Sequence, residues 1–258
     1  SRPSAQSGHN HYVAKESRWE GDDSERLSTL KVSIAQTMRA AELARSFNEA
    51  LSEADRREGR LRTGEISVIP CTVYRLTMPN GSVRYMSVER WLNGRYIKHN
   101  GNNGYIAEGD EGIPTFLASS TYNEPLSAAA ATSLLPQTFS HWSFEHSLAE
   151  ASDSSAMVCD IQGVGLNYTD VTVHTSDRRF GSTDLGELGF QKFFQSHKCN
   201  AACEALGLTR CQPSTEPRVA RACSASTATE QIQLIRTKHL RDRKRQRDVE
   251  TIEMQRAV

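Results

Sequence analysis

We expect an α+β fold, and local patterns in the sequence indicate two of its elements, a long helix and a β-hairpin. Apolar residues three and four apart over residues 25–54 predict a long amphipathic helix. Apolar and β-branched residues at 65–76, the turn signal Met78-Pro79-Asn80-Gly81 and the run at 82–88 predict a β-hairpin. With 258 residues, the chain is long enough for one large domain or two small lobes.

The composition argues against several classes of protein. Lysine plus arginine equals aspartate plus glutamate at 31 each, so no net charge points to nucleic acid or to a membrane surface. No apolar run approaches the roughly 18 residues of a spanning helix, and residues 1–10 lack the apolar core of a signal peptide. Six cysteines are too sparse for a disulfide framework. We therefore expect a cytoplasmic protein, with a nuclear location as the alternative.

The stretch MVCDIQGVGLNYTD, residues 157–170, places two carboxylates and an amide, those of Asp160, Asp170 and Gln162, at a strand end and in the loop after it. Residues 157–160 predict a short buried strand, and Gly163 and Gly165 are expected to end regular structure after it. Two carboxylates and an amide suit a hard cation such as Mg²⁺. On spacing alone, a polar loop with Asx turns is the better interpretation.

This stretch and the segments after it resemble the catalytic lobe of the atypical α-kinases. That family includes elongation factor 2 kinase, the myosin heavy chain kinases and the kinase domains fused to certain ion channels. The resemblance rests on these segments: DIQGVGLNYTD, His174-Thr175, Phe180-Gly181, Asp184-Leu185-Gly186 and SHKCNAAC at 196–203. It is dense over residues 137–208 and continues more thinly back to about Tyr12.

The resemblance implies a two-lobed, protein-kinase-like α+β fold with a structural zinc in the C-terminal lobe. Residues 1–106 would form a partial, nucleotide-clamping first lobe, and residues 107–210 a second lobe with the catalytic loop and the zinc site. A basic tail, helical or disordered, would follow at 211–258. In the family, two strands and a phosphate-covering loop precede the phosphate-binding lysine, so the first lobe is expected to lack its N-terminal strands.

Lys15 ends a predicted strand at 12–15 and matches the family lysine that reaches the ATP phosphates. Without the resemblance it would be a solvated surface residue. The helix at 25–54, with Ser24 as its predicted N-cap, would carry an acidic partner for this lysine. Three acidic residues are candidates for that partner: Asp23, Glu25 and Glu42.

Glu89 ends the returning strand of the hairpin, where relatives place a glutamate in the adenine pocket. Residues 89–104, ERWLNGRYIKHNGNNG, resemble the family segment ExxxxGxxxKxNxNxG, so Lys98 and Asn100 are candidates for nucleotide binding. Without the resemblance, Glu89 would be a strand-end carboxylate facing solvent and the segment an ordinary surface loop. Farther along, we expect a loop at 107–131, a helix at 128–135, a strand at 142–146 and a polar loop at 149–155.

His197, Cys199 and Cys203 lie in or at the end of a predicted helix and offer ligands typical of zinc. Zinc takes four tetrahedral nitrogen or sulfur ligands in structural sites, and by resemblance the fourth is His141. Buried cysteines acting as small hydrophobic residues are the alternative. The other cysteines are predicted to be free thiols: Cys71, Cys159, Cys211 and Cys223.

The segment FGSTDLGELG, residues 180–189, resembles the glycine-rich loop that α-kinases place near the substrate peptide. Its glycines are Gly181, Gly186 and Gly189. Taken alone, it predicts a loop followed by a helix capped at Thr183 or Asp184.

The resemblance implies transfer of the γ-phosphate of ATP, with Mg²⁺, to serine or threonine of a protein substrate. Asp160 would orient the substrate hydroxyl or accept its proton, Gln162 and Asp170 would hold Mg²⁺, and Lys15 would clamp the phosphates. The two aspartates could exchange these roles.

The alternative function is a catalytically inactive, kinase-like scaffold. The absent first strands and the unlocated partner of Lys15 favour the scaffold, while the complete set of candidate site residues opposes it. The basic run at 236–248 predicts a solvated or partner-bound helix, and nucleic-acid binding is disfavoured because no aromatic residues interleave with it. The sequence leaves the oligomeric state open.

Overall fold

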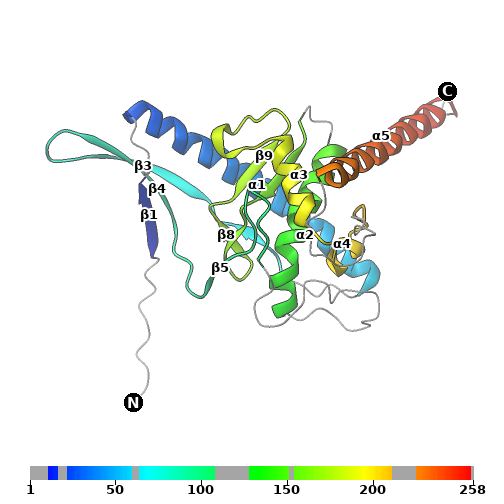
Figure 1. The fold of residues 1–258 in the computed structure, drawn as a ribbon, viewed down its shortest axis with the longest axis horizontal. Helices are drawn as coiled ribbons and strands as arrows, with labels where there is room; N and C mark the ends of the chain where they lie inside the picture. Colours follow the sequence, from blue (N-terminus) through cyan, green and yellow to red (C-terminus); the bar gives the residue numbers. More distant parts are fainter. Residues whose placement is uncertain are drawn as a thin grey trace, which may run out of the picture.

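The computed structural model of the chain describes residues 11–16, 22–59, 64–107, 128–150, 154–210 and 225–256. These residues form an α+β arrangement of small antiparallel or mixed sheets with helices packed around them (Figure 1). Several predictions fall outside this part of the chain: most of the loop at 107–131, part of the loop at 149–155, and the thiols of Cys211 and Cys223.

The long predicted helix is confirmed as α1 (Asp23–Glu58). Its N-cap is Asp22, whose carboxylate accepts hydrogen bonds from the backbone amides of Ser24 and Glu25 at 2.8 and 2.9 Å. The prediction of Ser24 as the cap was therefore wrong. Gly59 ends the helix in a left-handed conformation, with φ 68°, which suits glycine.

The predicted hairpin is confirmed as β3 (Cys71–Thr77) and β4 (Val83–Arg90). The predicted strand at 12–15 is confirmed as β1 (Tyr12–Glu16), which pairs antiparallel with the other side of β4. This sheet has the order β1-β4-β3 and packs on α1; it lies at the end of the molecule away from the C-terminus (Figure 1).

A second sheet joins four short strands in the order β2-β8-β7-β5. The strands are β2 (Ser67–Val68), β5 (Tyr96–Lys98), β7 (Gln162–Val164) and β8 (Asn167–Thr169). Gly163 and Gly165 were expected to end regular structure, but they lie within the β7–β8 hairpin. A Cβ atom at Gly163 would lie 1.9 Å from the carbonyl oxygen of Asn167, so the close approach of the two strands requires glycine.

The predicted buried strand is confirmed as β6 (Ala156–Cys159), which pairs antiparallel with β9 (Thr172–Thr175). All eight residues of this ladder are buried. Serine side chains of the neighbouring helix complete the edge of β6: Ser143 Oγ accepts from the amide of Val158 at 2.9 Å, and Ser147 Oγ accepts from that of Ala156 at 2.8 Å.

The predicted strand at 142–146 was wrong, because residues 128–149 form one helix, α2 (Ala128–Ala149), which continues through Pro136. Nearly every described position from Leu134 to Glu145 is buried. A helix surrounded by protein shows no amphipathic period. The alternation of aromatic and polar residues around Trp142 and Phe144 therefore imitated a strand.

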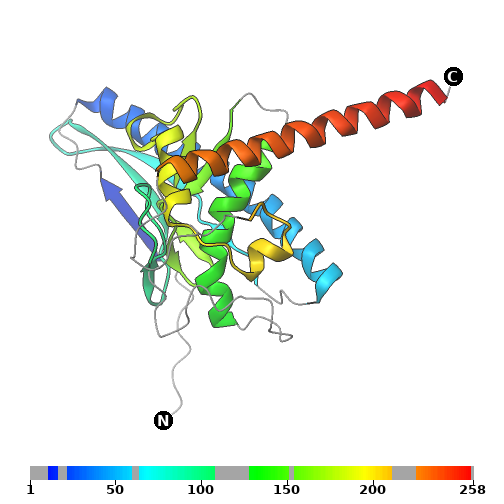
Figure 2. The same cartoon turned by 45° about the vertical axis from the view of Figure 1, so that its right-hand side comes forward.

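The remaining helices follow the β6–β9 ladder: the 3₁₀ turn η2 (Gly181–Thr183), α3 (Glu187–Ser196), α4 (Ala201–Ala205) and α5 (Ala225–Arg256). Neither Thr183 nor Asp184 caps α3, since Gly186 occupies its N-cap without a side-chain bond. The predicted helix over the basic run at 236–248 is confirmed within α5. Its first half packs on α2 and α3, and its second half projects away from the rest of the molecule (Figure 2).

Two hydrophobic clusters hold these elements together. The larger joins α1, α2 and the β6–β9 ladder, with Phe47, Phe139 and Tyr168 fully buried at its centre. The smaller joins α2, α3 and α5 through Phe144, Phe190 and Ile235 among others. Within the described residues, no helix is both long and apolar enough to span a bilayer.

Candidate active site and metal centre

The β6–β9 ladder brings Asp160 and Asp170 to one end of the same pair of strands. At that end Cys159, the last residue of β6, pairs with Thr172, the first residue of β9. Asp160 comes directly after Cys159, and Asp170 comes two residues before Thr172. Both aspartates have left-handed backbone conformations, with φ 56° and 54°. Such conformations are uncommon outside glycine and turn both side chains out of the ladder.

Lys15 joins the first sheet to this end of the ladder. Its Nζ lies 2.6 Å from Glu89 Oε1 and 2.6 Å from Asp170 Oδ2. Glu89 is buried in β4, and its other oxygen accepts a hydrogen bond from Thr169 Oγ1 at 2.7 Å. The acidic partner of Lys15 is thus Glu89 on β4, and the expectation of a partner at Asp23, Glu25 or Glu42 was wrong.

The carboxylates make this site electronegative. Burial of the Lys15 ammonium opposes its charge, but hydrogen bonds to Asp170 and Glu89 outweigh burial and raise its pKa above the ordinary value. Burial and the charges of Asp170, Glu89 and Asp160 raise the pKa of the nearby Tyr96 to about 12. A site with this field attracts a cation.

The second sheet aligns Lys98, Gln162 and Thr169 in one cross-strand row. Residues directly opposite each other on adjacent strands share a face of the sheet. Lys98 Nζ lies 2.5 Å from Asp160 Oδ1, and Gln162 Nε2 donates to the carbonyl oxygen of Asp170 at 3.4 Å. This row places the predicted amide ligand between the two aspartates.

Asn100 lies inside the protein. Its side chain is fully buried, and its Oδ1 accepts from the amide of Ile161 at 2.8 Å. Its Nδ2 donates to Gln137 Oε1 at 3.2 Å and to Ser140 Oγ at 3.0 Å on α2. These bonds hold the turn at Asp160 against α2, so Asn100 has a structural role next to the carboxylates.

The glycine-rich segment is organised by the fully buried carboxylate of Asp184. Asp184 accepts from the amide of Thr175 at 2.9 Å, from its hydroxyl at 2.6 Å and from the amide of Gly186 at 3.0 Å. Gly189 lies in α3, where a Cβ atom would be 2.1 Å from the ring of His174. Gly181 and Gly186 have positive φ angles of 74° and 63° and shape the loop itself.

Gln36 connects α1 to this loop and was not singled out from the sequence. The side chain is 4% exposed. Its Oε1 accepts from the amide of Val173 at 2.9 Å, and its Nε2 donates to Thr183 Oγ1 at 3.1 Å and to the carbonyl oxygen of Phe180 at 3.4 Å. A lone polar residue on a helix carries no sequence signal for contacts 137 to 147 residues away.

Replacing Gln36 with leucine is expected to destabilise the protein by about 1–3 kcal/mol, because it leaves buried backbone groups of β9 and the loop unpaired. Amide exchange at residues 180–186 should accelerate in parallel. Chemical denaturation and hydrogen exchange would measure the two effects, with the exposed Gln233→Leu change on α5 as the control. Equal effects for the two variants would refute the connection.

Four side chains of types that bind metals lie close together, His141 from α2 and three from the segment that follows α3: His197, Cys199 and Cys203. Their ligand atoms all lie within 4.8 Å of one another. His197 Nε2 is 3.2 Å from His141 Nδ1, and Cys203 Sγ is 3.8 Å from His197 Nε2. Cys199 was expected in or at the end of a helix; it lies between α3 and α4 and still reaches the cluster.

The donor set fits zinc. Burial and the neighbouring Cys199 side chain raise the pKa of the Cys203 thiol. Ionisation of both thiols is therefore disfavoured when no cation lies between the two sulfurs. A bound dication reverses this preference and deprotonates coordinating thiols. Two imidazole nitrogens and two thiolates in a buried, closed cluster match a structural zinc site.

Comparisons with known proteins identify the family of this chain. A sequence model described as the alpha-kinase family matches residues 4–203. The chain belongs to the alpha-kinase family. It is 36% identical over 177 residues to alpha-protein kinase vwkA of Dictyostelium discoideum, and 38% identical over 122 residues to human eukaryotic elongation factor 2 kinase. These alignments cover 66% and 47% of this chain but only 23% and 13% of the relatives, so the chain spans less than a quarter of either.

A solved alpha-kinase structure shares the fold. The alpha-kinase domain of myosin heavy chain kinase A, in complex with ADP, superimposes with a TM-score of 0.55 at 27% identity. The alignment covers 77% of this chain and 64% of that one. The α+β architecture described above is therefore that of an alpha-kinase domain.

Glu145 was not predicted as a site residue, and it contacts His141 of the four-residue cluster at 3.0 Å. The two residues are four apart on α2, a spacing that signals contact on a helix. Because the segment was predicted as a strand, where residues four apart do not meet, that signal was missed.

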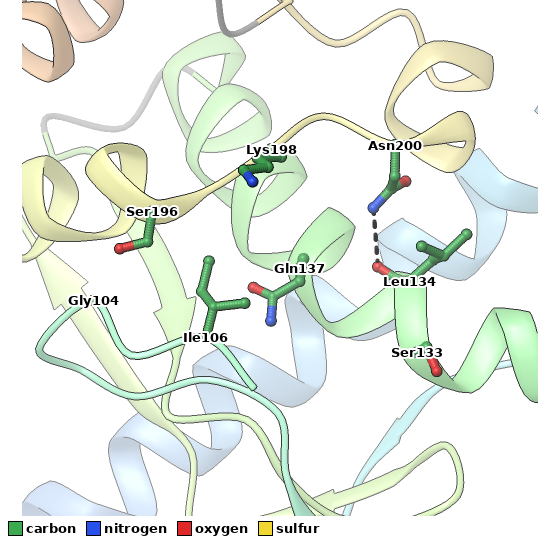
Figure 3. A pocket seen from close by; sticks show the side chains of 8 residues that line it. All are labelled: Gly104, Ile106, Ser133, Leu134, Gln137, Ser196, Lys198 and Asn200. Carbon is green, nitrogen blue, oxygen red and sulfur yellow. Dashed lines mark hydrogen bonds between the residues drawn. The ribbon is translucent and has the colours of Figure 1, made fainter. Parts of the chain in front are cut away.

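A cavity of about 350 Å³ is lined by residues from α2, from the segment around the end of α3 and from the loop that holds Gly104 and Ile106. Figure 3 shows Lys198, which lies between the ligands His197 and Cys199 in sequence, and Gln137 of α2 at its wall. Asn200 donates to the carbonyl oxygen of Leu134 at its rim. The residues that line the cavity do not include Lys15, Glu89, Asp160 or Asp170.

Proposed function

We propose that this chain is a protein serine/threonine kinase that transfers the γ-phosphate of ATP to a protein substrate. The observation that carries the proposal is the contact of Lys15 with both Glu89 and Asp170. It joins the first sheet to the end of the β6–β9 ladder beside which Asp160 and Asp170 lie. Family membership supports the same activity, since the matched relatives are named as protein kinases.

Lys15 is placed to clamp the nucleotide phosphates. Its Nζ is held between two carboxylates at 2.6 Å each, and the Asp170 side chain is 49% exposed. An incoming phosphate can therefore exchange with Asp170 while Glu89 keeps the ammonium in position. This exchange keeps the lysine charged throughout, because each partner it gains or loses is an anion.

Gln162 and Asp170 are the residues that would hold Mg²⁺. Both offer oxygen atoms at the end of the ladder, and Mg²⁺ is usually bound by one or two carboxylates together with phosphate oxygens. When bound, Mg²⁺ neutralises charge that develops on the phosphate oxygens during transfer. The negative field that raises the pKa of Tyr96 supports cation binding here.

Asp160 would orient the substrate hydroxyl or accept its proton. Its partner Lys98, at 2.5 Å, fixes the carboxylate in place, and the buried Asn100 holds the backbone just after it. A fixed carboxylate lowers the entropy that must be lost when the hydroxyl is aligned with the phosphate. Asp170 remains the alternative for this role, because it lies at the same end of the ladder.

We also propose that His141, His197, Cys199 and Cys203 hold a structural zinc. The ion would join α2 to α4 and to the C-terminal end of α3. A closed site of two histidines and two thiolates leaves no open position for a substrate, so its contribution is to stability. The catalytic end of the ladder is built on α2, which makes activity depend on this centre.

Product analysis tests the proposed activity. The purified protein, given radiolabelled ATP and Mg²⁺ with a mixture of serine- and threonine-containing proteins, should yield phosphoserine or phosphothreonine after acid hydrolysis. Omitting Mg²⁺ should abolish the label. Label found only on tyrosine would contradict the specificity, and a folded, zinc-loaded protein that transfers no label would favour an inactive scaffold.

A further inference from the structure

We propose that Glu145 is the outer-shell carboxylate of the metal centre and that, through His239, it fastens helix α5 to that centre. The proposal rests on the proposed zinc and is independent of the phosphoryl-transfer activity. Glu145 is a positioning residue in this account: it touches a ligand of the metal and not the metal itself.

Glu145 determines which nitrogen of His141 can bind the metal. His141 Nε2 lies 3.0 Å from Glu145 Oε1, and an ionised carboxylate can only accept a hydrogen bond. The proton of the neutral ring must therefore sit on Nε2. That leaves the lone pair on Nδ1, the atom that faces His197 and Cys199 in the cluster.

The other metal-ligating histidine has no such support. His197 Nδ1 is buried without a hydrogen-bond partner among the described residues, and its ring is stacked on Phe193 with centroids 4.8 Å apart. Among the described residues, no hydrogen bond orients this ring from the side away from the four-residue cluster. Glu145 is thus the carboxylate that orients a histidine of the cluster in the described part of the chain, and its loss leaves neither ring held by an acceptor outside the cluster.

The carboxylate of Glu145 also binds two segments that follow the ligands in the chain. Its Oε1 accepts from the amide of Thr209 at 2.7 Å, and its Oε2 accepts from the Thr209 hydroxyl at 3.3 Å. His239 Nε2 on α5 donates to Oε2 at 3.3 Å. The side chain of Glu145 is 6% exposed, so burying its charge requires these partners.

Helix α5 has further contacts on the same lobe. Arg236, one turn before His239, forms an ion pair with Glu187 at 2.6 Å, at the start of α3. Ile232 and Ile235 are buried against the phenylalanines of α2 and α3. The family match ends at residue 203, so α5 lies beyond the matched residues, and His239 links it to the proposed metal centre.

A link of this kind couples metal binding to the docking of α5. If a docked α5 helps to hold Glu145, and Glu145 holds His141 in its metal-binding tautomer, each event must favour the other by the same free energy. Release of α5 would then weaken the metal centre, and loss of metal would loosen α5.

The test measures zinc affinity by competition with a chromophoric chelator in the full chain. Glu145→Gln should weaken zinc binding by about 10–100-fold, the effect typical of outer-shell partners. His239→Asn, at a position that is 19% exposed, should weaken it in the same direction by less. Amide exchange in α5 should accelerate in both variants, and the visible spectrum of cobalt-substituted protein should shift in Glu145→Gln.

Glu150→Gln is the matched control. Glu150 also lies four residues after a histidine, His146, at 3.5 Å, but that histidine binds no metal in this account. The zinc affinity of the Glu150→Gln variant should equal that of the wild type. A wild-type protein that binds no zinc would overturn the metal centre and this inference together. Wild-type affinity in both Glu145→Gln and His239→Asn would overturn this inference alone, and if Glu145→Gln fails to fold, His239→Asn decides.

Discussion

Replacing Cys203 with serine is expected to unfold the second lobe rather than to slow the reaction. Cys203 lies on α4 and its side chain is buried. Its sulfur faces His141 of α2 and His197 at the end of α3. Apparent binding free energies of structural zinc are of order 10–16 kcal/mol, whereas a whole domain is stable by about 5–15 kcal/mol. A site reduced to three ligands cannot recover that contribution.

Zinc content and far-ultraviolet circular dichroism measure this effect together. The expected result is a zinc-free protein whose helical signal is much reduced at ambient temperature. Cys71→Ser is the control, because Cys71 is a free, half-buried thiol outside the cluster. A zinc-free Cys203→Ser protein with the wild-type unfolding temperature would contradict the structural role of the metal.

Replacing Asp170 with asparagine is expected to lower the rate of phosphoryl transfer by at least about a thousandfold while the fold is kept. A metal-binding carboxylate supplies several kcal/mol of transition-state stabilisation, and each 1.4 kcal/mol is about tenfold in rate. The half-exposed ion pair with Lys15 is worth no more than about 1 kcal/mol of stability. Asparagine also tolerates the left-handed backbone at this position, as aspartate does.

Local sequence patterns predicted the elements whose one face is buried and whose other face meets solvent. The helix at 25–54 and the hairpin around Asn80-Gly81 have such faces, and α1, β3 and β4 confirm them. The fully buried strand β6 was predicted from its short apolar run, but part of the buried helix α2 was mistaken for a strand. Trp142 and Phe144 lie in a helix covered on nearly all sides, so the period of the helix is absent from the sequence.

The candidate site could be predicted only in part for a different reason. Asp160, Gln162 and Asp170 are close in sequence, but Lys15 reaches Asp170 across 155 positions, and no local rule detects such a contact. The family resemblance pointed to Lys15 and Glu89 separately, while their direct pairing at 2.6 Å appears only when β1 and β4 are adjacent in space. Gln36 depends on the same kind of long-range packing, whereas the contact of Glu145 with His141 is local and was missed because that segment was predicted as a strand.

The measurement that tests the central claim most directly is the initial rate of labelled γ-phosphate transfer at saturating Mg·ATP. Wild-type protein, Asp170→Asn and the exposed α5 control Asp242→Asn would be compared, with zinc content and folding confirmed in each. The account predicts phosphoserine or phosphothreonine from the wild type and the control, and a rate lower by at least about a thousandfold in Asp170→Asn. Equal rates in all three would contradict the assignment of this carboxylate cluster as the catalytic site.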